Sequence, residues 1–228
     1  VNPTQFNNAE DLKKYPRDLQ KDTSLLEKLG VHFVFAPAPE EMYSKEEMET
    51  AFEFDFNGLD EVMEGKMRPG HFNGVVQVVS RLFDFIQPTR AYFGEKDFQQ
   101  LAIIRHMVER SSMAERYTGL QIIGCPIVRE QSGLAMSSRN ERLSSQEKQT
   151  AIAISQTLFS SVEWAKSATV EEVQQRVIDT INAVQGLEVE YYNIVDKTTL
   201  KPTNTFHNAV GCVTVYCGPV RLIDNIQY

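Results

Sequence analysis

Apolar residues recur every three or four positions in several segments of this chain, and shorter apolar runs separate those segments. The clearest helical pattern covers residues 71–86, with apolar side chains at Val75, Val78, Val79, Leu82, Phe83 and Ile86. Pro88 ends this predicted helix, because proline lacks the N–H that would continue it. A second helix is predicted at 19–30, closed by Gly30, and the apolar run at 31–35 is predicted to be a strand.

Two short strands flank a further helix in the middle of the chain. Residues 91–93 and 120–124 are predicted strands, and the segment 97–110 between them is a predicted helix with one apolar stripe. Alternating strands and helices are typical of βα units around a parallel sheet. We therefore expect an α/β fold for the first part of the chain.

The pattern changes after residue 127. Ser144 and Glu147 form a predicted capping box before a long helix, and Thr169 and Glu172 repeat the device before a second helix. Three predicted strands follow at 189–195, 210–217 and 220–226. Helices followed by strands indicate a small α+β unit, so we expect two domains, at 1–127 and 128–228.

Composition narrows the class of protein. The chain has 31 acidic and 23 basic side chains and a net charge of -8, which disfavours binding to nucleic acid. Its apolar runs are far too short to cross a bilayer, so no membrane partner is expected. The three cysteines form no CxxC pair, and their odd number argues against a disulfide framework, which favours a reducing cytoplasmic location.

The first candidate for chemistry is the turn Gly94-Glu95-Lys96-Asp97, where a strand meets a helix. Strand ends face the ligand crevice in α/β sheets, and the free N–H groups of a helix N-terminus attract phosphate. Gly94 permits close backbone approach, and Lys96 adds a mobile positive charge. Spacing alone favours the alternative, in which Asp97 is an N-cap and Glu95 and Lys96 are solvated turn charges.

The second candidate is Ser137-Ser138-Arg139, in which two hydroxyls precede a fixed cation. Such a set suits a triphosphate whose negative charge grows as pyrophosphate leaves. The alternative is a polar connection before the cap at Ser144, and the motif by itself favours that alternative.

Five blocks of the chain, taken in order, resemble the pantothenate synthetase family. They are 1–6, 15–17, 68–75, 93–100 and 133–140. One such block could arise by chance, whereas five in register are highly specific. The resemblance implies a Rossmann-like nucleotidyltransferase domain that binds ATP, a smaller α+β C-terminal domain that closes as a lid, and a homodimer.

The resemblance also implies the roles of individual residues. The positions that match ATP contacts are Gly94, Glu95, Lys96, Asp97, Val128, Met136, Ser137, Ser138 and Arg139. Lys96, Ser137, Ser138 and Arg139 are expected to stabilise and anchor the departing pyrophosphate. Gln5 and Gln100 match the two pantoate glutamines, and a neutral amide can both donate to and accept from pantoate. Their alternatives are a loop amide and a helix-surface residue.

The implied reaction is a ligation in two steps. The pantoate carboxylate attacks Mg²⁺-bound ATP to give pantoyl adenylate, and the β-alanine amine then displaces AMP to give pantothenate. Phosphates and water are expected to hold most of the Mg²⁺ shell, so no protein ligand for the metal is assigned.

The chain departs from the family at its start. Family members open with a strand and a Met-Gly-Ala-Leu-His-x-Gly-His-like loop, and nothing similar precedes Val1. A βαβ element takes about 30 residues, so we expect that the first βα unit is missing and that a polypeptide beginning at Val1 is catalytically weak or inactive. Two alternatives stay open: a non-catalytic nucleotide-binding or dimerisation remnant, and another nucleotidyltransferase, such as a cytidylyltransferase or a tRNA synthetase fragment.

Overall fold

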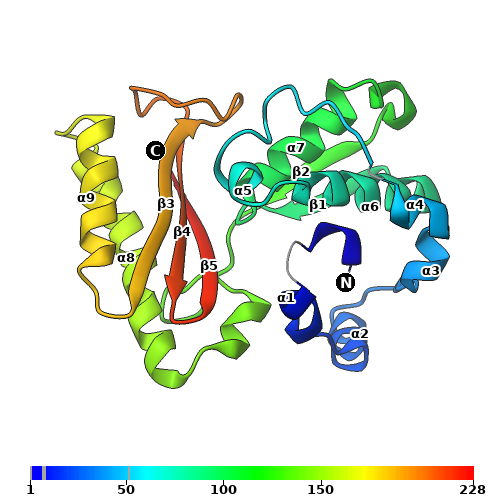
Figure 1. Cartoon of the computed structure of the whole chain (residues 1–228), viewed down its shortest axis with the longest axis horizontal. Helices are drawn as coiled ribbons and strands as arrows, with labels where there is room; N and C mark the ends of the chain where they lie inside the picture. Colours follow the sequence, from blue (N-terminus) through cyan, green and yellow to red (C-terminus); the bar gives the residue numbers. More distant parts are fainter. Residues whose placement is uncertain (1, 7–8, 51) are drawn as a thin grey trace. The chain divides into compact units, whose positions relative to one another are not determined.

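The computed structural model describes residues 2–6, 9–50 and 52–228 (Figure 1). The chain forms two compact units, one of Val1–Phe54 with Pro69–Gln87 and the other of Asp55–Arg68 with Pro88–Tyr228. We call them unit 1 and unit 2 and describe each by itself. The domain boundary between residues 127 and 128 remains a prediction.

Unit 1 is helical in its described part. Its elements are η1 (Pro3–Gln5), α1 (Ala9–Lys14), α2 (Leu19–Lys28), α3 (Pro39–Met42), α4 (Lys45–Glu49) and α6 (His71–Ile86). The predicted helix 71–86 is confirmed at both ends as α6. It ends because Gln87 takes a left-handed conformation, with φ 48°, directly before Pro88.

The short helix η1 packs closely on α6. A Cβ added to Gly74 of α6 would lie 2.5 Å from the carbonyl oxygen of Thr4 and 2.7 Å from the backbone nitrogen of Gln5. Only glycine fits this backbone approach. His71 adds a bond to the same turn, since its Nδ1 donates to the Gln5 carbonyl over 2.8 Å.

The predicted strand at 31–35 is wrong. The segment 31–38 lies in no helix or strand, and the side chain of Phe33 is 92% exposed. Helix α2 was predicted correctly, yet it too buries no side chain. An apolar run indicates that a segment favours burial, but a strand also needs a neighbouring strand for its backbone hydrogen bonds. No neighbour pairs with this segment among the described residues.

Unit 2 contains a parallel strand pair with a helix between its strands. Strand β1 (Arg90–Gly94) and strand β2 (Gln121–Cys125) pair in parallel, so that Gly94 lies opposite Cys125. Helix α7 (Phe98–Glu109) and the short η2 (Ala114–Tyr117) connect them. Both predicted strands, the predicted helix and the parallel arrangement are therefore confirmed.

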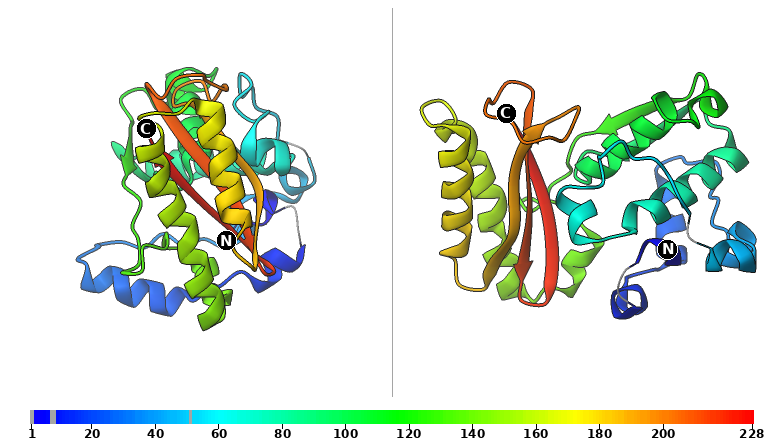
Figure 2. Two further views of the ribbon diagram at one scale, coloured as in Figure 1. Left: turned by 90° about the vertical axis from the view of Figure 1, so that its left-hand side faces the viewer. Right: turned by 45° about the horizontal axis from the view of Figure 1, so that its top comes forward.

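The second sheet of unit 2 is antiparallel and is covered by two helices. Its order is β3 (Leu187–Asp196), β4 (Ala209–Cys217) and β5 (Val220–Gln227). Helices α8 (Ser145–Trp164) and α9 (Val170–Asn182) lie side by side along one face, as two views show (Figures 1 and 2). Both predicted capping boxes are present. All three predicted strands are confirmed.

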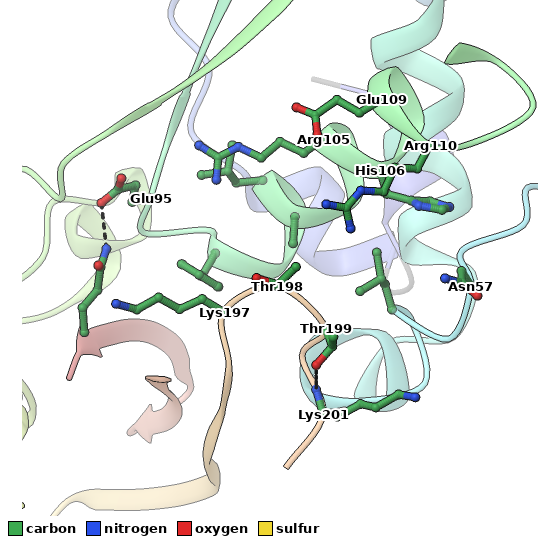
Figure 3. Close-up of a pocket in the computed structure, with 15 residues that line it drawn as sticks. Asn57, Glu95, Arg105, His106, Glu109, Arg110, Lys197, Thr198, Thr199 and Lys201 are labelled. Atoms are coloured by element: carbon green, nitrogen blue, oxygen red, sulfur yellow. Dashed lines mark hydrogen bonds between the residues drawn. The ribbon is translucent and has the colours of Figure 1, made fainter. Parts of the chain in front are cut away.

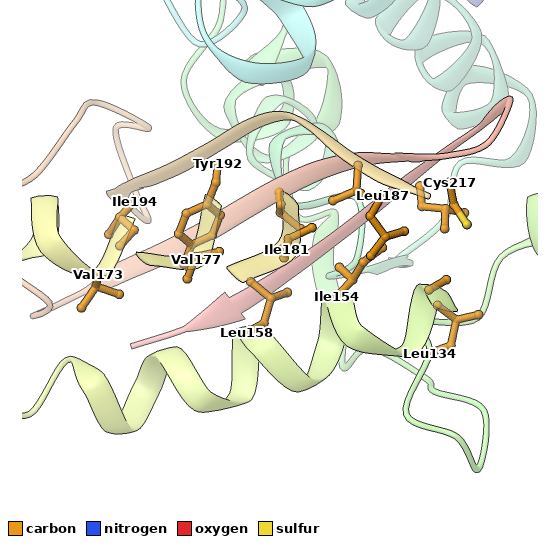
Figure 4. Packing of buried hydrophobic residues seen from close by; sticks show 14 of the residues in the cluster. Leu134, Ile154, Leu158, Val173, Val177, Ile181, Leu187, Tyr192, Ile194 and Cys217 are labelled. Atoms are coloured by element: carbon orange, nitrogen blue, oxygen red, sulfur yellow. The ribbon is translucent and has the colours of Figure 1, made fainter. Parts of the chain in front are cut away.

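A hydrophobic core of unit 2 lies between these helices and the antiparallel sheet (Figure 4). Ile154 and Leu158 from α8 and Val177 and Ile181 from α9 are at most 2% exposed. They pack against alternate residues of the strands, such as Tyr192, which is 1% exposed. Helical spacing and strand alternation thus meet on one buried layer.

The opposite face of the sheet holds α5 (Met63–Met67). Glu64 on α5 accepts hydrogen bonds from the hydroxyls of Tyr191 and Thr214, over 2.8 and 3.0 Å. Arg221 adds two bonds to the same carboxylate, both of 2.7 Å. These bonds fasten the segment 55–68 to the antiparallel sheet within unit 2.

The three cysteines carry free thiols. Burial raises the pKa of Cys212 to about 12, with the charges of Glu64 and Asp224 adding to the effect. This thiol therefore stays protonated at neutral pH. In the described part of the chain, every helix is too short or too polar to span a bilayer.

Candidate functional site

The turn after β1 is open to ligands on one side. A Cβ added to Gly94 would meet nothing within 4 Å, and both Gly94 and Asp97 are exposed. Asp97 occupies the N-cap position of α7, as the alternative interpretation required, but its side chain makes no capping bond. The N-terminus of this twelve-residue helix is therefore not capped by that carboxylate, and it can interact with an anion.

Strand β5 holds this turn in place. The side-chain nitrogen of Asn225 donates to the carbonyls of Glu95 and Lys96, over 2.8 and 3.0 Å. Gln227, two residues further, donates to the Glu95 carboxylate over 3.2 Å. Asn225 is only 3% exposed, so these bonds are shielded from water. The turn is consequently fixed to the antiparallel sheet.

The hairpin 128–136 is the second part of the candidate site. The N–H of Met136 donates to the Val128 carbonyl over 2.9 Å, and Arg129 and Ala135 form an antiparallel bridge. Val128 and Met136 are thus direct neighbours, with exposed fractions of 66% and 54%. Arg129 binds Asp224 of β5 through two bonds of 2.7 and 2.9 Å, which fixes the hairpin to the same strand as the turn.

The serine and arginine motif begins the short η3 (Ser138–Arg142). The hydroxyl of Ser137 accepts from the N–H of Arg139 over 3.2 Å. Asn140, which is 4% exposed, donates to the carbonyl of Ala135 and to the carboxylate of Glu130, over 3.1 and 2.9 Å. Ser138 is exposed and Arg139 is half-buried.

Lys96 and Ser137 line one cavity, although 41 positions separate them in the sequence. Asn140 and Asp224 belong to the same lining. The cavity measures about 10 Å³, which leaves space for about one water molecule. Arg139 is not among its lining residues. The structure therefore brings together part of the predicted phosphate site.

The two predicted glutamines lie in different units. Gln5 ends η1 in unit 1, where its side-chain oxygen accepts from Asn2 over 3.4 Å. Gln100 lies in the first turn of α7 in unit 2 and is half-buried.

Comparison with known proteins assigns the family. A family model described as "Pantoate-beta-alanine ligase" matches residues 1–227. The chain belongs to this ligase family. A relative from Phocaeicola vulgatus named "Pantothenate synthetase" is 58% identical over 231 residues, which cover 100% of this chain and 79% of the relative. One of the same name from Porphyromonas gingivalis is 48% identical, with the same coverage.

Solved structures of the ligase family have the same fold. The chain matches pantothenate synthetase from Thermus thermophilus with a TM-score of 0.90 and 39% identity, over 99% of this chain and 80% of that one. The ligase from Francisella tularensis, described as complexed with beta-gamma ATP and beta-alanine, gives a TM-score of 0.77 and 33% identity, over 100% and 76%. The resemblance found in the sequence is confirmed, and it excludes a different nucleotidyltransferase family.

The residues that support the site of this family member were missed in the sequence. Asn140, Asp224 and Asn225 are each at most 5% exposed and all bond to the turn or the hairpin. One signal was present, because Asp224 and Asn225 are two adjacent polar residues inside the apolar strand 220–226. Buried polar residues in an apolar strand indicate hydrogen-bonded partners.

A metal cage made by the protein is not found in the described residues. No group of three or more His, Cys, Asp or Glu side chains there could hold a metal ion.

Proposed function

We propose that this chain catalyses the ATP-dependent ligation of pantoate and β-alanine through a pantoyl-adenylate intermediate. Family membership supports the ligase activity. The observation that carries the rest is that Lys96 and Ser137 line the same small cavity, because Asn225 and Asp224 fix the turn and the hairpin to neighbouring positions of β5. The Francisella neighbour, described as complexed with beta-gamma ATP and beta-alanine, supports the choice of ligands.

ATP is placed along the turn, the hairpin and η3. The proposed contacts are Gly94, Glu95, Lys96, Asp97, Val128, Met136, Ser137, Ser138 and Arg139. The exposed pair Val128 and Met136 offers an apolar surface for the flat adenine ring. The cavity at Lys96 is too small for a phosphate group, so the triphosphate would lie outside it, against the exposed Gly94.

In the first step a carboxylate oxygen of pantoate attacks the α-phosphorus of ATP. A new P–O bond forms, the bond to the bridging oxygen breaks, and pyrophosphate leaves with that electron pair. Lys96 and Arg139 stabilise the added negative charge, while Ser137 and Ser138 donate hydrogen bonds to it. Mg²⁺ enters as part of the MgATP substrate, bound mainly by phosphate and water.

In the second step the amine of β-alanine attacks the acyl carbon of the adenylate. The C–N bond forms, AMP leaves with the electrons of the C–O bond, and the nitrogen loses a proton. Gln5 and Gln100 match the two pantoate glutamines of the family, and each amide can both donate to and accept from pantoate. The protein contributes mainly position.

Two further properties belong to the proposal. The free thiols support a reducing cytoplasmic location. A homodimer is expected from the family resemblance alone.

The test measures pyrophosphate release from ATP, pantoate and Mg²⁺ in the full-length protein. Lys96→Ala is expected to lower the rate by about 100-fold, because removing one charge-stabilising donor typically costs that much. Lys166→Ala is the matched control, since it removes the same charge from an exposed side chain that pairs only across one helical turn. A rate for Lys96→Ala within a few fold of the wild type contradicts the role of Lys96.

The remaining alternative is a nucleotide-binding remnant without activity. Calorimetry with ATP, combined with the pyrophosphate assay, distinguishes this alternative from the ligase. A remnant would bind ATP in the calorimeter but release no pyrophosphate when pantoate is added.

A further inference from the structure

Unit 2 contains a second cavity that the proposed reaction does not use (Figure 3). It measures about 470 Å³, within the range of small-molecule sites. Residues along the whole of α7 line one part of the cavity, and the loop between β3 and β4 lines another. It shares no lining residue with the cavity at Lys96. The two cavities are therefore separate sites.

The lining of this second cavity is basic. Four basic and two acidic side chains contribute to it, which gives a local charge of +2 in a chain of net charge -8. The basic residues are Arg105 and Arg110 on and beside α7 and Lys197 and Lys201 on the loop. The acidic residues are Glu95 and Glu109. Although the chain as a whole is acidic, this local group of cations attracts anions.

These cations have no anionic partner in the described part of the protein. Among the described residues 2–6, 9–50 and 52–228, no ion pair or side-chain hydrogen bond joins Arg105, Arg110, Lys197 or Lys201 to a carboxylate. Two other half-buried arginines of unit 2 differ, since Arg129 binds Asp224 and Arg221 binds Glu64. Arg105 and Lys197 are half-buried. Because partial burial without a partner disfavours a charge, an anionic ligand would be stabilised here.

The loop that carries the two lysines is fixed by its own bonds. Asp196 accepts from the N–H groups of Thr198 and Thr199, over 3.0 and 2.8 Å, and from the amide of Asn208 over 2.9 Å. These bonds lower the pKa of Asp196, and the bond from the N–H of Thr199 contributes most. Leu200 anchors the loop in the core at 1% exposure. A ligand therefore meets a loop that is already ordered, which reduces the entropy cost of binding.

Three buried apolar side chains line part of the cavity, and we call this part its apolar floor. Leu59, Phe98 and Leu101 line it and are at most 9% exposed. A bare inorganic ion would leave this surface without contact, whereas the carbon skeleton of an organic ligand would cover it.

We propose that this cavity binds a small organic anion that carries a phosphate group or paired carboxylates. Its anionic groups bind between the two arginines at α7 and the lysines of the β3–β4 loop, and its carbon skeleton lies on the apolar floor. Glu95 links the cavity to the turn at Gly94, because its side chain lines the cavity while its carbonyl is held by Asn225.

The test is a calorimetric titration of the full-length protein with a saturating non-hydrolysable ATP analogue present throughout. Glycerol 3-phosphate represents the phosphate class, and glutarate and citrate represent the carboxylates. Lys197→Ala and Arg105→Gln are each expected to weaken binding by about tenfold, since each removes a charge that faces the ligand. Lys166→Ala changes the net charge by the same amount, but Lys166 does not line the cavity. This variant is expected to bind the probes as the wild type does.

The outcomes distinguish the ligand classes. Saturable binding of glycerol 3-phosphate alone assigns a phosphate ester, and binding of glutarate or citrate alone assigns a carboxylate. Binding of both classes, weakened in the two cavity variants, supports the shared anionic chemistry. The proposal is overturned if no probe binds saturably below about 10 mM, or if both cavity variants bind as tightly as the control. Pyrophosphate release is measured separately, so the proposed ligase activity does not depend on this result.

Discussion

Replacing Glu64 by glutamine tests how strongly the segment 55–68 is fastened to the antiparallel sheet. The Glu64 side chain is 13% exposed and accepts hydrogen bonds from Arg221, Tyr191 and Thr214. Burial by itself raises the pKa of this carboxyl, but the bonds and the charge of Arg221, with the two hydroxyls, outweigh burial and lower the pKa to about 2.

The magnitude follows from linkage. A fall in pKa from 4.5 to about 2 on folding corresponds to about 3 kcal/mol of stability, at about 1.4 kcal/mol per pH unit. Glu64→Gln keeps the shape and removes the charge, so we expect a loss of about 3 kcal/mol at pH 7. Arg221 still binds Glu190, over 2.9 Å from Nε, and the arginine is therefore not left without an anion.

The pH dependence has a defined sign. Because the folded pKa lies below the unfolded one, this stability is fully present above about pH 4.5 and is lost as the pH falls toward 2. The difference between the wild type and Glu64→Gln should shrink by about 1 kcal/mol between pH 7 and pH 4, and by about 2 kcal/mol at pH 3. Comparing two variants at each pH cancels the contribution of the other carboxyls.

Urea unfolding followed by tryptophan fluorescence provides the measurement. Trp164 is the only tryptophan of the chain and lies in unit 2, so it reports on the unit that contains Glu64. Glu163→Gln serves as the control, because Glu163 and its partner Lys166, which lies just beyond the end of α8, are both exposed. A loss below about 1 kcal/mol for Glu64→Gln, or a difference that stays constant from pH 7 to pH 3, would refute the reasoning.

Three further substitutions test other parts of the structure. Gly74→Ala places a Cβ 2.7 Å from the backbone nitrogen of Gln5, the residue proposed to bind pantoate. We therefore expect the KM for pantoate to rise about tenfold with the KM for ATP unchanged. Equal changes in both constants would contradict this. Asp224→Asn removes the charge that pairs with Arg129 and should lower the unfolding free energy by about 3 kcal/mol in urea titrations. Thr169→Ala removes a helix cap and should cost about 1 kcal/mol, seen as a Tm lowered by about 2–4 °C.

The sequence by itself determined the local elements and the family. The helix at 71–86 was predicted to the residue, and the capping boxes at Ser144 and Thr169 marked the starts of α8 and α9. These signals work because helix periodicity, caps and proline act within a few residues of the chain. Five short blocks in order were enough for the family, which the comparisons confirm.

Only the tertiary structure decided which of these elements meet. The apolar run at 31–35 gave no sign that it would lack a strand neighbour, since pairing depends on other parts of the chain. The shared cavity of Lys96 and Ser137 depends on a turn and a hairpin that are both fixed to β5, by Asn225 and by Asp224. Contacts between residues so far apart in sequence follow from strand register and packing, which no local pattern records.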